Sequence, residues 1–126
     1  AGNEATCRVS WPSALPGVIA VGALGWDGPA SFTNYGDWVD ACAPGVFVVS
    51  RFHDGIDYYD DLDPKTADFH GWAKWCGTSF AAPIVAAAIA REAALYGIST
   101  SAAADRVVHD PRLFRIPGLG TVVNIH

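Results

Sequence analysis

The chain has 126 residues, of which 51% are hydrophobic and 17% are charged, and its formal net charge is −5. This length suggests one domain or part of one, and the composition is unlike that of disordered chains. The negative charge, without any run of Lys or Arg, argues against a nucleic-acid partner. No membrane partner is expected, because we find no apolar run of membrane-spanning length and no signal peptide.

Four short stretches predict β-strands. Residues 18–24 (VIAVGAL) form a continuous apolar run, residues 39–43 end at a Pro-Gly pair, and residues 47–52 and 71–76 are two further extended segments. Continuous apolar strands, in contrast to alternating ones, are typical of a buried parallel sheet.

Two helices are predicted in the second half of the chain. Residues 79–95 are rich in alanine and apolar nearly all round, and Gly97 follows as a C-terminal cap. We therefore expect this helix to be buried. Ser99 is placed to cap a second helix that runs through Val108. Strands mixed with helices indicate an α/β sheet.

The sequence of residues 77–83 (GTSFAAP) joins a predicted strand to the predicted buried helix. A nucleophilic serine needs a fixed backbone and a free N–H near the developing oxyanion, and the first turn of a helix supplies both. The alternative is that Thr78 or Ser79 only caps the helix, which serine and threonine often do.

The longer string 77–86 (GTSFAAPIVA) resembles the nucleophile motif of the subtilases, the subtilisin-like serine proteases. The resemblance implies that Ser79 attacks the peptide carbonyl, with Phe80 in place of the usual Met. Further segments resemble the family in the same order: 1–4 (AGNE), 11–23 (WPSALPGVIAVGA), 32–36 (FTNYG), 39–45 (VDACAPG) and 118–124 (GLGTVVN).

This resemblance implies a part of a doubly wound, mainly parallel subtilisin-like sheet, with a buried central helix that starts at the nucleophile. Residues 1–126 would form the C-terminal portion of a peptidase domain. Asn3 would complete the oxyanion hole, although Gly-Asn is also ordinary turn chemistry. The expected activity is that of a serine endopeptidase acting through an acyl-enzyme. The alternative is a non-catalytic, subtilase-like peptide-binding or structural module.

The subtilases place their Asp and His motifs before the Asn segment, so we expect both to lie upstream of residue 1. None of His53, His70, His109 and His126 stands in a similar context, and we interpret none as the base. The chain alone is expected to be inactive. Its expected partners are a protein or peptide substrate and the upstream half of its own domain.

No cofactor is expected to be required, although structural calcium is possible. Asp40 resembles a subtilase residue beside a weak cation site, but one carboxylate falls short of the ligands that calcium needs, and bonding to nearby backbone amides is favoured. The stretch from Asp54 to Asp68 holds six aspartates without EF-hand spacing, and we interpret it as a solvated loop.

Three cysteines, Cys7, Cys42 and Cys76, cannot all pair within one chain. Their spacing does not match a zinc site. We lean towards one disulfide in a secreted or extracytoplasmic protein, with its pairing left open.

Overall fold

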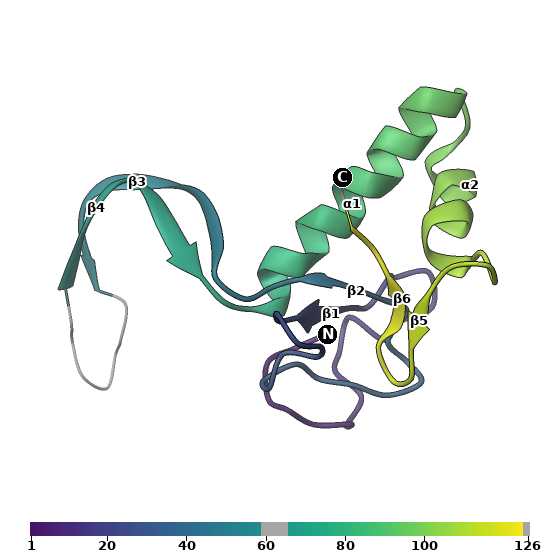
Figure 1. The fold of residues 1–126 in the computed structure, drawn as a ribbon, viewed down its shortest axis with the longest axis horizontal. Helices are drawn as coiled ribbons and strands as arrows, with labels where there is room; N and C mark the ends of the chain where they lie inside the picture. The colour runs from purple at the N-terminus through teal and green to yellow at the C-terminus, as the bar shows by residue number, and fades with distance from the viewer. Residues whose placement is uncertain (59–65, 125–126) are drawn as a thin grey trace.

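The computed structural model describes residues 1–58 and 66–124 (Figure 1). Its centre is a four-stranded sheet of β1 (Val21–Leu24), β2 (Ala41–Pro44), β6 (Gly120–Val122) and β5 (Arg115–Ile116), in that order. β1, β2 and β6 are parallel, and β5 pairs with β6 in the antiparallel sense. The predicted mainly parallel α/β sheet is confirmed.

The first two strands are buried because they consist of small apolar residues that let a helix approach closely. Ala23, Ala41 and Ala43 are fully buried and form one core cluster with Ala81 and Val85 of the following helix. The strands begin two or three residues later than predicted from residues 18–24 and 39–43. β6 was not predicted, since its three residues are too short to show a period.

Helix α1 (Thr78–Tyr96) packs against β1 and β2 and ends before Gly97, which has the left-handed φ of 61° expected of a C-cap. The prediction that this helix is buried all round was wrong for the described residues. Only Thr78, Ala81 and Val85 are buried, because the sheet covers one side of the helix. The remaining apolar surface of α1 is open in this chain.

The length and composition of α1 would also suit a membrane span, so the expectation that no apolar run reaches that length was wrong. This is weak support for a membrane role, because a core helix of a soluble protein passes the same test. The contacts of α1 with β1 and β2 assign it to the α/β layer.

The second helix follows the prediction closely. α2 (Thr100–Ala104) begins at Ser99, whose hydroxyl accepts a hydrogen bond from the Ala102 N–H at 3.2 Å. It continues into a π-helical turn, η1 (Asp105–His109), and packs beside α1 (Figure 1). The π-helical geometry had no signal in the sequence.

β3 (Val48–Tyr58) and β4 (Thr66–Trp75) form a separate antiparallel hairpin that extends away from the sheet (Figure 1). The prediction of a loop over the whole of 54–68 was therefore wrong at both ends. Pairing continues past an irregularity after Arg51, where the rings of Phe52 and Phe69 lie 4.7 Å apart. Because aspartate has a low propensity for β-strands, the sequence did not predict this pairing. Asp60, Asp61 and Asp63 lie outside the described residues.

No disulfide joins the three cysteines, all of which lie in the part of the chain that the structure describes, so the expectation of one was wrong. Cys7 is exposed on the N-terminal segment, Cys42 is buried on β2 beside Val39 and Leu119, and Cys76 accepts a hydrogen bond from the Phe47 N–H. The three thiols thus belong to different surroundings. Burial raises the pKa of the Cys42 thiol to about 11.

Candidate active site

Ser79 is the second residue of α1 and is exposed to solvent. The turn before it is fixed by the Gly77 N–H, which donates to the Gly45 carbonyl at 2.8 Å just after β2. Since Ser79 lies in the first helical turn, its N–H has no intrahelical carbonyl to bond. The positive end of the helix dipole adds to this, so the position favours a developing negative charge.

The capping interpretation of Thr78 and Ser79 was wrong, because the N-cap residue of α1 is Gly77 and no side chain there caps the helix. The Thr78 hydroxyl instead accepts a hydrogen bond from the Gly2 N–H at 3.2 Å. Ser79 is therefore left with an exposed hydroxyl that the helix does not use as a cap.

The Asn3 side chain reaches the start of α1 from the other end of the sequence. Its Oδ1 accepts a hydrogen bond from the Thr78 N–H at 2.9 Å. Because an N–H can only donate, the atom that faces it must be the carboxamide oxygen, and this leaves the Nδ2 donor pointing elsewhere. A Cβ built on Gly77 would lie 3.6 Å from Nδ2, so this donor borders the same turn. The structure thus brings Asn3 to the first turn of α1, the turn that carries Ser79.

Asn34 is a buried residue beside this site whose role the sequence did not reveal. Its side chain is 1% exposed and bonds to residues on both sides of Asn3. The segment 32–36 resembles a subtilase turn, but nothing in its spacing indicates contact with residues 1–6.

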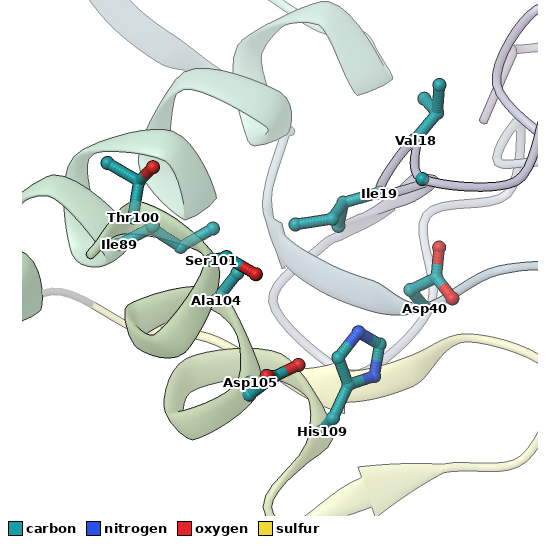
Figure 2. A pocket seen from close by; sticks show the side chains of 10 residues that line it. Val18, Ile19, Asp40, Ile89, Thr100, Ser101, Ala104, Asp105 and His109 are labelled. Carbon is teal, nitrogen blue, oxygen red and sulfur yellow. The ribbon is translucent and has the colours of Figure 1, made fainter.

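Asp40 does not lie at the Ser79 site. It lines a separate cavity of about 590 Å³ between the loop before β1 and the α2–η1 segment (Figure 2). Its Oδ2 accepts a hydrogen bond from the Ala20 N–H at 2.7 Å, which confirms the interpretation of Asp40 as bonded to a backbone amide. His109 and Asp105 face the same cavity (Figure 2). Within residues 1–58 and 66–124, no group of three or more His, Cys, Asp or Glu could hold a metal ion.

The described histidines lie on other elements than Ser79. His53 and His70 are on the hairpin, and His109 ends η1 beside Asp40. His126 lies outside the described residues. The exclusion of all four as the base stays a prediction.

The model of the Subtilase family matches residues 1–109. The chain belongs to the subtilase family. Among the curated relatives of this subtilase chain, a thermophilic serine proteinase of Bacillus sp. (strain AK1) is 40% identical over 87 residues, which are 68% of this chain and 18% of the relative. The subtilisin-like serine protease Pen ch 13 of Penicillium rubens is 37% identical over 110 residues, 86% of this chain and 24% of the relative.

Solved structures agree on the fold of this subtilase chain. A cold adapted subtilisin-like serine proteinase is 25% identical and superposes with a TM-score of 0.66, covering 97% of this chain and 42% of that one. The chain thus spans 18–24% of the two curated relatives and less than half of this structure. The family and the α/β fold expected from the motifs are confirmed.

Proposed function

We propose that the chain carries the nucleophile and an oxyanion donor of a serine endopeptidase. Ser79 is the nucleophile, and the Ser79 N–H and the Asn3 Nδ2 are the two oxyanion donors. A serine hydroxyl at its ordinary pKa is a poor nucleophile without a base that a carboxylate orients. In this proposal both groups come from a segment upstream of residue 1, where the subtilases place their His and Asp motifs. The substrate is a protein or peptide.

The observation that carries this proposal is the hydrogen bond from the Thr78 N–H to the Asn3 Oδ1, at 2.9 Å. It ties two segments 75 residues apart in the sequence to one helix end. By occupying the carboxamide oxygen, it directs the Nδ2 donor away from Thr78. A donor fixed in this way needs no reorganisation when charge develops, which is the basis of oxyanion stabilisation.

The reaction then follows from the chemistry of the site. Ser79 Oγ attacks the scissile carbonyl carbon while its proton passes to the upstream histidine, and the carbonyl oxygen becomes an oxyanion held by the two donors. The C–N bond breaks as the imidazolium gives its proton to the leaving amine, and water hydrolyses the acyl-enzyme. Within this chain, the residues that act are Ser79 and Asn3.

The open face of α1 supports the proposal that more of the domain covers it. Sixteen of the nineteen residues of the helix are not fully buried here, although the helix is mostly apolar. Large exposed apolar surfaces mark contacts with further protein. We assign this face to the upstream half of the same domain, and propose a secreted or extracytoplasmic enzyme that requires no cofactor.

The test uses the full-length protein that contains this chain and a set of unstructured peptide substrates. Ser79→Ala should abolish hydrolysis, and Asn3→Ala should lower kcat by about 10²–10³-fold, the loss that follows removal of one oxyanion donor in a subtilisin. Thr121→Val, a buried substitution on β6 away from the site, serves as the control. A parent protein that folds but hydrolyses no peptide would favour the alternative, a non-catalytic binding module.

A further inference from the structure

Asn34 forms a hub of hydrogen bonds beneath the N-terminal segment. Its Oδ1 accepts from the N–H groups of Glu4 (3.0 Å) and Thr6 (3.3 Å). Its Nδ2 donates to the Ala1 carbonyl (3.1 Å) and to the Glu4 carboxylate (2.6 Å). With a side chain that is 1% exposed, Asn34 satisfies both of its polar atoms on this one segment.

These contacts bracket Asn3 without touching it. The Asn34 backbone N–H also donates to the Gly2 carbonyl at 2.9 Å, so the residues before and after Asn3 are both held. Gly2 has a φ of 113°, and a Cβ added there would collide with the Asn34 carboxamide. The backbone at residue 3 therefore has little room to shift relative to Asn34.

Asn34 is in turn anchored to the sheet. The hydroxyl of its neighbour Thr33, which is also buried, accepts a hydrogen bond from the Ala23 N–H of β1 at 3.0 Å. A continuous path of hydrogen bonds thus runs from β1 through Thr33 and Asn34 to the segment around Asn3, and from Asn3 Oδ1 to the first turn of α1.

We propose that Asn34 is a positioning residue, which fixes the Asn3 carboxamide relative to the Ser79 N–H and so sets the geometry of the oxyanion site. The proposal rests on the proposed function. Oriented donors lose much of their effect when they move, and a misplacement of about 1 Å can cost about 10²-fold in rate. If Asn34 acts only through Asn3, substituting Asn34 should no longer change kcat in a variant that already lacks the Asn3 carboxamide.

The experiment is a double-mutant cycle in the full-length protein, with kcat and KM measured on one peptide substrate. Asn34→Ala is made in the parent and in Asn3→Ala. Thr121→Val is the matched control, because Thr121 is equally buried and its hydroxyl bonds to groups outside the N-terminal segment, donating to the Val108 carbonyl of η1 and accepting from Arg115 of β5. Thermal unfolding is followed for every variant.

In the parent, Asn34→Ala should lower kcat by about 10- to 100-fold and leave KM within about twofold. In Asn3→Ala, the same substitution should change kcat by less than about twofold. An equal loss in both backgrounds, or the same loss of kcat in Thr121→Val, would overturn the positioning role. If Asn34→Ala does not fold, Glu4→Ala replaces it, since Glu4 is exposed and its substitution removes one partner of Asn34. It should lower kcat several-fold in the parent only, and an equal loss in Asn3→Ala again overturns the proposal.

Ser79→Ala in the same series distinguishes failure of the proposed function from failure of the positioning role. If it retains the parental kcat, the proposed function fails. If it is inactive while the Asn34 and Asn3 effects multiply independently, only the positioning role fails.

Discussion

Substituting Gly45 by alanine should disturb the nucleophile turn from below. A Cβ at this position would lie 2.7 Å from the Ala23 Cβ and 2.9 Å from the Gly77 carbonyl oxygen, whereas ordinary contact begins at 3.4 Å. The neighbours must therefore retreat by about 0.5 to 0.7 Å. Ala23 is fully buried in β1, whereas the Gly77 turn is held to Gly45 by one hydrogen bond, so we expect the turn to shift. Overpacking of this kind costs about 1–3 kcal/mol of stability.

Since Gly77 precedes Ser79 by two residues, we expect kcat of Gly45→Ala in the full-length enzyme to fall by about tenfold, scaled from the cost of misplacing catalytic groups. The assay combines kcat on a peptide substrate with thermal unfolding. Gly25→Ala is the matched control, because a Cβ there meets only ordinary contacts at 3.6 and 3.7 Å. Parental kcat in Gly45→Ala, or an equal loss in Gly25→Ala, would refute this explanation of the turn.

Three further predictions concern side chains other than those of Ser79 and Asn3. Phe80 forms no sulfoxide, so peroxide should not inactivate the full-length enzyme through this position, whereas Phe80→Met should become sensitive; equal sensitivity of the two would contradict this. Because burial raises the pKa of Cys42 from 9.0 to about 11 in the folded state, its thiol ionises at lower pH in the unfolded chain than in the folded one. The free energy of unfolding should therefore fall as pH rises from 9 to about 11, by on the order of 2–3 kcal/mol. In Cys42→Ala this loss of unfolding free energy should be absent, and the same dependence on pH in Cys42→Ala as in the parent would contradict the prediction. By resemblance to the subtilases, the stretch from Asp54 to Asp68 lies near the substrate residues that follow the scissile bond. Its six aspartates should then favour Lys or Arg at those positions several-fold at low salt, about 1 kcal/mol. The same preference in a variant with all six changed to Asn would contradict this.

The sequence predicted those parts of the fold in which local chemistry and tertiary structure agree. The buried strands around Ala23 and Ala43 were visible as apolar runs, and Ser99 and Gly97 marked helix ends through their capping preferences. The Gly-Thr-Ser motif located Ser79 at a helix start, since that position combines a strand end with small residues. Each of these signals lies within a few residues of the feature that it predicts.

Features that depend on distant contacts could not be predicted in this way. The hairpin ladder depends on pairing between β3 and β4 across an irregularity, against the weak strand preference of aspartate. The open side of α1 depends on which other segments are present. Asn34 gains its place from five hydrogen bonds to residues about 30 positions away, and no local pattern records them. Asn3 was found only because the family resemblance supplied its position.

The most direct test of the central claim is covalent labelling of the nucleophile. The full-length protein is treated with a fluorophosphonate probe, digested, and mapped by mass spectrometry, in parallel with Ser79→Ala and with the isolated 126-residue chain. We predict one adduct, on Ser79, in the full-length protein and none in the other two samples, because the proposed function draws the base that activates the hydroxyl from the upstream segment. An adduct on another serine, or rapid labelling of Ser79 in the isolated chain, would contradict it.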